Sequence, residues 1–365
     1  MTDKKHSSPR ERAANFANRL GVRLPLFLAP MAGACPVSLS IAVANAGGLG
    51  ACGALLMKPD EIEAWSAEFR KGSQGAFQIN LWIPDPQPPR DFELEKRQRE
   101  FLSRWGPPVP AEAGDALLPN FEAQCQAMLR AAPKAISSIM GIYPPAFVTE
   151  LKARGILWFA TATTVAEAKA AEEASADVIV AQGMEAGGHR GAFRAEEAET
   201  QMVGLMALVP QVVDAVSVPV IATGGIADAR GIAAALILGA SAVQIGTGFL
   251  RTPEAKTHPA YVQKLAQTEA HETTITRYFS GRPGRSVANA FVLAANAPNA
   301  PLPAPYPVQR GLTRAMREAT RTAGDADRMQ MWAGQAAKLA QDQLAGAVVQ
   351  QLWAEASQLL PYFHD

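Results

Sequence analysis

The most regular feature of the chain is a series of short apolar segments rich in Val, Ile, Leu and Phe, most of them ending at a small or polar residue. Most are continuously apolar rather than alternating, which is typical of strands covered on both faces in a parallel sheet. We predict strands near residues 24–30, 49–53, 76–83, 135–141, 156–160, 177–182, 218–223 and 242–247.

The segments between these strands have the pattern of helices. Most predicted strands start roughly 20–27 residues after the previous one, which is the length of a strand, a loop and a crossover helix. Thr164 and Glu167 have the spacing of a capping box at the start of one helix. Eight such units predict an α/β fold, a (β/α)8 TIM barrel, with an open doubly wound sheet as the alternative. Helices are expected at 10–20, 36–46, 58–71, 144–154, 164–174 and 228–238.

Two regions fall outside the repeat. The proline-rich insertion 84–134 follows the third strand, and its charged middle, 91–104, predicts a helix in a candidate lid. The tail after residue 309 has a helical composition, and the Pro/Ala stretch 295–308 resembles a linker. The helical segments of the tail are expected at 312–320, 329–344 and 348–360. We therefore predict a barrel from 1–84 and 133–308, and a smaller helical subdomain from 85–132 and 309–365.

Composition sets limits on the kind of protein. The 365 residues exceed the about 250 of a barrel, which leaves room for the smaller subdomain. The 34 basic and 34 acidic residues balance, so the basic excess of a nucleic-acid-binding protein is absent. No segment has the length of a membrane span or the apolar core of a signal peptide. The three cysteines lack metal-site spacing, so we expect no metal and a reducing, cytoplasmic location.

Glycine-rich turns follow the last two predicted strands. Gly224 and Gly225 precede a helix that begins near Asp228, and Gly246 and Thr247 follow the final strand. Uncovered main-chain N–H groups and a helix N-terminus together bind phosphate, and Thr247 adds a hydroxyl. Glycines that only form tight turns are the alternative, and the phosphate could belong to a nucleotide or a sugar. No GxGxxG motif opens the first βα turn, so a dinucleotide Rossmann site is not predicted.

Three polar residues lie at predicted strand ends. The amides of Asn80 and Gln182 could bind a planar heterocycle or simply cap the barrel rim. His189 follows two glycines that allow its imidazole to project inward, where it could act as a base or, when protonated, hold an anion. A structural histidine is the alternative. Glu185 and Arg190, its neighbours, can be explained as solvated charges.

The strand ends resemble those of one known family. They carry, in this order, LAPMAG, NAGGLG, FQIN, AQGMEAGGHRG, PVIATGGI and AVQIGTGF, and SGRPGR follows at 280–285. Over residues 24–290 this combination resembles nitronate monooxygenase, formerly called 2-nitropropane dioxygenase. The resemblance implies FMN at the carboxyl end of the barrel and His189 as the catalytic histidine. The implied FMN contacts are Pro30, Met31, Ala32, Asn80, Gln182, Gly187, Gly224, Gly225, Gln244, Ile245, Gly246 and Thr247.

The resemblance also implies a reaction. A small anionic nitronate would be oxidised through a flavin semiquinone, with O2 reoxidising FMN and release of nitrite and a carbonyl compound. His189 would remove the α-proton of a nitroalkane or bind the nitronate. Residues 332–336 resemble the tail of the class that acts on propionate 3-nitronate. No nucleic-acid or membrane partner is implied, and a homo-oligomer stays open.

Other functions fit part of the same pattern. NAD(P)H:quinone reductases and FMN-dependent enoyl-ACP reductases share the phosphate loops and the glycine-flanked histidine, but they reduce FMN with a nicotinamide. A non-catalytic flavin-binding protein would not need His189. A flavin-free aldolase or synthase barrel is disfavoured because no lysine lies at a predicted strand end.

Overall fold

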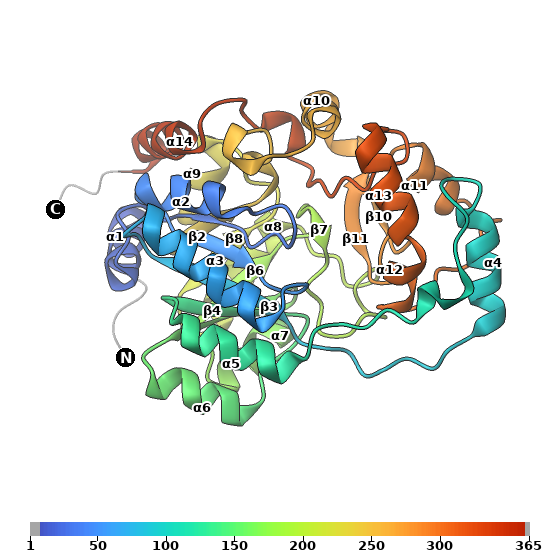
Figure 1. Ribbon diagram of the computed structural model, residues 1–365. Coiled ribbons are helices and arrows are strands. Elements are labelled where there is room, and N and C mark those ends of the chain that lie inside the picture. Colours follow the sequence, from blue (N-terminus) through green and yellow to red (C-terminus); the bar gives the residue numbers. More distant parts are fainter. Residues whose placement is uncertain (1–7, 362–365) are drawn as a thin grey trace.

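The computed structural model describes residues 8–361, and its centre is a barrel of parallel strands with the order β1-β9-β8-β6-β5-β4-β3-β2 (Figure 1). A parallel bridge between Phe27 and Leu49 joins the two edges. The predicted (β/α)8 barrel is therefore confirmed, and the open doubly wound alternative is wrong. The barrel strands are β1 (Leu26–Leu28), β2 (Gly50–Gly53), β3 (Phe77–Trp82), β4 (Ala135–Ile139), β5 (Leu157–Ala162), β6 (Val178–Gln182), β8 (Val220–Thr223) and β9 (Ala242–Ile245).

Helices surround the barrel, most of them close to the predicted positions, but those at Phe121–Ala131 and Leu205–Ala215 were not among the predicted ranges. Thr164 caps α7 by accepting a hydrogen bond from the Glu167 N–H at 3.2 Å. The Glu167 carboxylate instead binds Thr163, so the reciprocal half of the predicted capping box is wrong. These helices are α1 (Pro9–Leu20), α2 (Val37–Asn45), α3 (Pro59–Gly72), α5 (Phe121–Ala131), α6 (Pro145–Ala153), α7 (Val165–Glu173), α8 (Leu205–Ala215) and α9 (Ala229–Ile237).

The interior of the barrel has two layers, because inward-facing residues alternate along each strand. The lower layer is apolar, and Phe16 and Leu20 of α1 pack onto it. One step closer to the carboxyl ends, the inward positions are polar and buried. The apolar layer consists of Phe27, Leu49, Phe159, Val178, Val180, Ile221 and Ala242. The polar layer consists of Gln78, Asn80, Ser137, Thr161, Gln182, Thr223 and Gln244.

A second, antiparallel sheet lies beside the barrel mouth and was not predicted. It has the order β10-β11-β7, formed by β10 (Thr273–Thr276), β11 (Gly284–Val287) and β7 (Gly188–His189). Short polar strands of this kind lack the apolar run by which the barrel strands were found. The helices beside this sheet have an apolar cluster of their own, which includes Leu102, Phe279 and Met316. Figure 1 shows this part at one side of the barrel, with α4 (Phe92–Leu102), α11 (Ala290–Ala295), α12 (Val308–Leu312) and α13 (Arg314–Ala323).

The predicted helix at 329–344 is wrong. This segment is irregular, with a bridge residue at Trp332 and one short 3-10 turn at Ala337–Leu339. Its main chain adds to the edge of β11, where Trp332 pairs with Ser286 and the Val287 N–H donates to Met331 O at 3.0 Å. Sheet pairing thus overrides the helical composition. We call residues 329–340 the strap.

The predicted linker 295–308 is also more than a linker, because Ala304 and Tyr306 within it are buried. In the tail, α14 (Ala345–Leu359) packs on α9 and α2, and in the insertion α5 packs on α3. The division into a barrel and a helical subdomain stays a proposal, and these contacts favour counting α5 and α14 with the barrel. The remaining α-helix of residues 8–361, α10 (Pro259–Gln267), lies between β9 and β10. His6 and His364 lie outside the described residues. Within residues 8–361 no helix is long and apolar enough to cross a membrane.

Candidate active site

His189 lies at the barrel mouth, held by the small sheet. Its strand pairs with β11, where His189 faces Gly284. Its Nε2 lies 2.7 Å from Ser280 Oγ. The imidazole lies between two indoles, with ring centroids 4.6 Å from Trp82 and 4.7 Å from Trp332. Trp82 ends β3 and Trp332 comes from the strap, so three distant segments form this wall.

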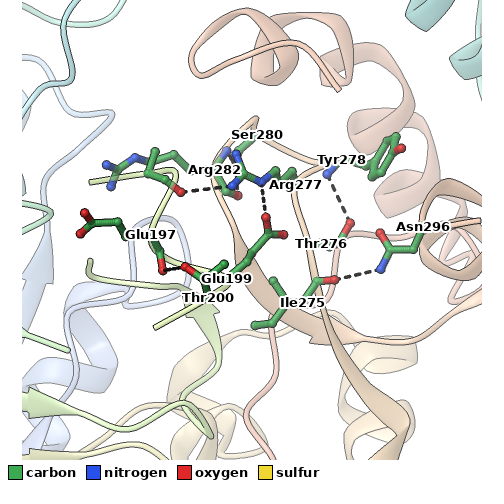
Figure 2. A network of polar contacts seen from close by, with 11 residues as sticks. Glu197, Glu199, Thr200, Ile275, Thr276, Arg277, Tyr278, Ser280, Arg282 and Asn296 are labelled. Atoms are coloured by element: carbon green, nitrogen blue, oxygen red, sulfur yellow. Dashed lines mark hydrogen bonds and ion pairs between the residues drawn. The ribbon is translucent and has the colours of Figure 1, made fainter. Parts of the chain in front are cut away.

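The turn that carries Ser280 is itself fixed by polar contacts, as Figure 2 shows. Arg277 Nε lies 2.7 Å from Glu199 Oε2 in the loop after β7. Ser280 Oγ accepts from the Arg282 N–H and donates to Arg282 O, each at 3.3 Å. The hydroxyl partner of His189 is therefore held in place before any ligand binds.

The electrostatic surroundings keep His189 neutral. Burial lowers its pKa to about 3, and the positive charges of Arg310 and Arg282 act in the same direction. Arg282 is neutralised by Asp85, with Nε 2.8 Å from Oδ2. Arg310 donates its guanidinium to no acceptor among residues 8–361. The mouth therefore has an uncompensated positive charge that belongs to Arg310 and not to the imidazole.

The three predicted amide residues all lie in the polar layer. Asn80 Nδ2 donates to Ser137 Oγ at 3.0 Å. Gln244 Oε1 accepts from Gln78 Nε2 at 2.8 Å. Gln78 Oε1 is buried and finds no partner in the described part of the chain. The layer thus offers donors and acceptors to a planar heterocycle at the end of the barrel.

The predicted phosphate turns have the geometry that an anion needs. Gly224 and Gly225 have φ values of 113° and 68°, which glycine adopts without strain. In the described part of the chain, the main-chain N–H groups of Gly224, Gly225 and Ile226 donate no hydrogen bond. They precede α9, which Asp228 caps. Free N–H groups at the start of a helix are suited to a phosphate.

Four more of the implied FMN contacts, Met31, Gly187, Gly246 and Thr247, lie close to one another beside the barrel mouth. A Cβ on Gly187 would lie 2.8 Å from Thr247 Oγ1 and 2.4 Å from the nitrogen of Gly334 in the strap. Only glycine therefore allows the strap to approach Thr247, whose hydroxyl accepts from Gly334 N–H at 3.0 Å. The Met31 side chain comes within 3.3 Å of a Cβ position on Gly246.

The first loop meets β2 and β9. A Cβ on Gly53 would lie 2.5 Å from the nitrogen of Ala32. Pro30 lies in the same loop, whose Ala29 N–H donates to Ile245 O at 2.9 Å. The Ile245 side chain belongs to the hydrophobic core, so Ile245 can offer a ligand only its main chain.

Sequence reasoning missed several residues of the site. They include Trp82, Ser280, Tyr306, whose ring centroid lies 5.3 Å from that of Trp82, and Arg310. They come from segments predicted as strand interior, loop, linker and helical tail, and so were not selected. The view of Arg190 as a solvated charge is wrong, whereas Glu185 is half-buried and hydrogen-bonded. Glu185 accepts from the Leu205 N–H at the start of α8, and Arg190 is 1% exposed.

The cysteines take no part in this site. Cys35, Cys52 and Cys125 are buried, and burial raises the pKa of each thiol. A neutral, enclosed thiol is a poor nucleophile. Within residues 8–361 no group of His, Cys, Asp and Glu side chains is arranged to hold a metal ion.

A (β/α)8 barrel with buried amides in its mouth, a glycine turn of unpaired main-chain N–H groups and a histidine between two indoles has the arrangement of an enzyme barrel that binds a small molecule at the carboxyl ends of its strands. The model of the nitronate monooxygenase family matches residues 15–355. A probable nitronate monooxygenase of Bacillus subtilis is 37% identical, covering 88% of this chain and 92% of the relative. The chain therefore belongs to the nitronate monooxygenase family, and it is an oxidoreductase that acts on small molecules.

Two solved structures resemble the fold. A nitroalkane oxidase from Streptomyces ansochromogenes has 34% sequence identity and a TM-score of 0.86, covering 94% of this chain and 98% of its own. FabK from Thermotoga maritima has 26% identity and a TM-score of 0.73, covering 94% of this chain and 96% of its own.

Proposed function

We propose that the protein is an FMN-dependent enzyme that oxidises small anionic nitronates with O2, releasing nitrite and a carbonyl compound. The observation that carries this proposal is the mouth itself, where His189 lies between Trp82 and Trp332 beside the unpaired charge of Arg310. A cytoplasmic location is part of the same proposal.

FMN would provide hydrogen-bond partners for polar atoms that have none within the described residues. The free N–H groups of Gly224, Gly225 and Ile226 suit its phosphate, and the unpartnered Gln78 Oε1 and the amides of Asn80 and Gln182 suit the ring edge. When bound, FMN supplies the electron acceptor for nitronate oxidation, which no side chain here provides.

His189 acts as a neutral group in this proposal. Its Nε2 is engaged by Ser280, and Nδ1 makes no hydrogen bond within residues 8–361. Nδ1 is therefore the ring nitrogen left to accept an α-proton from a nitroalkane, or to donate a hydrogen bond to a preformed nitronate in the other tautomer. Because burial and the charges of Arg310 and Arg282 lower the pKa of His189 to about 3, the imidazole rests neutral at neutral pH, and we assign the anion to Arg310.

Arg310 can be tested by removing its charge. Arg310→Met should raise KM for an anionic nitronate about tenfold, the value of one charge-assisted hydrogen bond, and leave FMN binding unchanged. Arg314→Met is the matched control, because Arg314 is an exposed arginine on α13. Equal KM values for the two variants would contradict the anion site.

The direct assay uses the purified protein. We expect a yellow protein that carries FMN and consumes O2 with a nitronate. The second candidate is a nicotinamide-dependent reductase, which the same barrel motifs also fit. Turnover with NAD(P)H and a quinone or an enoyl thioester, and none with nitronate, would overturn the first proposal in favour of the second. A colourless protein that binds no added FMN would contradict both.

A further inference from the structure

Arg190 is the most deeply buried charge beside the proposed cofactor site. It follows His189 directly and is 1% exposed. Its main-chain N–H donates to Pro283 O at 2.9 Å, which ties β7 to the loop before β11. Burial lowers its pKa only to about 10, so Arg190 remains charged at neutral pH. A buried charge of this kind is costly unless its contacts compensate for the lost water.

The contacts of Arg190 concentrate on the end of β6. Its Nη1 donates to Gly183 O at 2.8 Å and to Gln182 Oε1 at 3.2 Å. The Gly191 N–H donates to the same Gln182 oxygen at 2.8 Å. Two donors on one amide oxygen define which side of the Gln182 amide is oxygen and which is nitrogen.

The amide nitrogen of Gln182 consequently becomes the donor on the other side. Gln182 Nε2 donates one N–H to His189 O at 3.2 Å. Its second N–H has no acceptor within residues 8–361. Because Gln182 belongs to the polar layer of the barrel, this N–H is available to a ligand at the mouth.

A comparison with Arg282 shows that burial alone does not explain these contacts. Arg282 is 2% exposed, but it pairs with a carboxylate, Asp85, at 2.8 Å. Arg190 has no carboxylate within ion-pair distance among the described residues, and its Nε and Nη2 are buried without a partner. Its strongest contacts are with main-chain carbonyls and with the side chain of Gln182.

We infer that Arg190 is a positioning residue that fixes the Gln182 amide as a hydrogen-bond donor to the flavin ring, an inference that rests on the proposed FMN site. A donor fixed in this way, polarised by the guanidinium, stabilises a heterocycle more as its electron density rises on reduction. Without Arg190 the amide can rotate and present its oxygen instead. The reduced cofactor should then lose more binding energy than the oxidised one.

The test measures the cofactor and not turnover. Arg190→Met, Arg190→Lys and Gln182→Met are compared with the wild type by FMN titration of the apoprotein and by potentiometric titration of the holoprotein. For Arg190→Met we expect reduced FMN to be weakened about tenfold more than oxidised FMN, which lowers the two-electron midpoint potential by about 30 mV. The lysine variant keeps the charge and should restore part of the shift.

The double variant R190M/Q182M decides whether Arg190 acts through Gln182. If it does, adding R190M to Q182M leaves the midpoint potential of Q182M unchanged; additive shifts would contradict the inference. Arg70→Met is the control for loss of a guanidinium that binds main-chain carbonyls, since Arg70 on α3 bonds Ala131 O and Ala132 O outside the barrel. Its potential should equal that of the wild type.

Each failure has its own signature. If R190M does not fold, R190K serves in its place, and an unchanged potential in R190K would overturn the inference. A wild-type protein that binds FMN and oxidises nitronate, together with arginine variants of wild-type potential, would overturn the role of Arg190 alone. A wild-type protein that binds no FMN would overturn the proposed function itself.

Discussion

The two ends of the barrel interior are built from the same strands but have opposite chemistry. In β6 the inward residues are Val178 and Val180, followed by Gln182; in β5, Phe159 is followed by Thr161. The apolar layer has no polar atom to satisfy and packs against α1. The polar layer leaves atoms such as Gln78 Oε1 unpaired, which costs stability unless a ligand completes them. Folding and function are therefore separated along the barrel axis.

The largest expected effect is on catalysis, from a change at the mouth. His189→Asn should reduce turnover of a neutral nitroalkane by about 10²–10⁴-fold, because proton abstraction loses its base. With a preformed nitronate the loss should be smaller, since no α-proton is removed. Steady-state rates with the two substrate forms measure the difference. Unchanged turnover of both would contradict a catalytic role of His189.

A change in the apolar layer should lower stability and leave the cofactor site unchanged. Phe159 is 0% exposed, so Phe159→Ala should lower the free energy of unfolding by about 3–5 kcal/mol. Urea unfolding measures this loss, and Phe159→Leu is the milder control. The FMN dissociation constant of the folded fraction should stay at the wild-type value. A loss of FMN affinity in that folded fraction would show that the two layers are not independent.

The phosphate turn offers a matched pair of glycines a few residues apart. Gly225 has φ 68°, and a Cβ there would lie 3.0 Å from Glu185 Cβ, so Gly225→Ala should cost about 1–2 kcal/mol and weaken FMN about tenfold. Gly231 in α9 would place a Cβ no closer than 3.6 Å to its neighbours. Gly231→Ala should therefore stabilise the fold by about 0.5–1 kcal/mol and leave FMN affinity unchanged. Equal FMN affinities in both variants would exclude the phosphate from this turn.

The smallest effect concerns acid stability. The pKa of His189, about 3 in the folded protein, lies below the value of about 6.5 in an unfolded chain, so folding favours the neutral imidazole. This contribution is complete above about pH 6.5 and is lost as the pH falls toward 3. Arg310→Met removes a nearby positive charge and should raise the pKa of His189. Urea midpoints near pH 7 and pH 3, the latter within the range where the folded imidazole titrates, should then differ less in R310M than in the wild type, and an equal difference would contradict this coupling.

The barrel was predictable because each strand and helix has its own local sequence pattern. The mouth also contains residues from segments that have no such pattern. Asn80, Gln182 and Gln244 are the last inward positions of apolar strands, and the glycine turns follow them directly, so sequence order alone brings these residues to one end. Trp82 escaped selection because its indole continues an apolar run. Trp332 lies in a segment with helical composition that instead pairs with β11. Ser280 is placed by the turn between two very short strands, β10 and β11, and Arg310 by α12, which packs on α4 and α13. Such long-range pairing leaves no periodic signal in the sequence.

The central claim is that a nitronate delivers its electrons to FMN at the mouth lined by His189. It is tested most directly by mixing the purified holoprotein with a nitronate without oxygen and recording the flavin absorbance. The account predicts that nitronate bleaches the flavin, that admitted O2 restores the colour with release of nitrite, and that NAD(P)H leaves the colour unchanged. Bleaching by NAD(P)H and none by nitronate would contradict it.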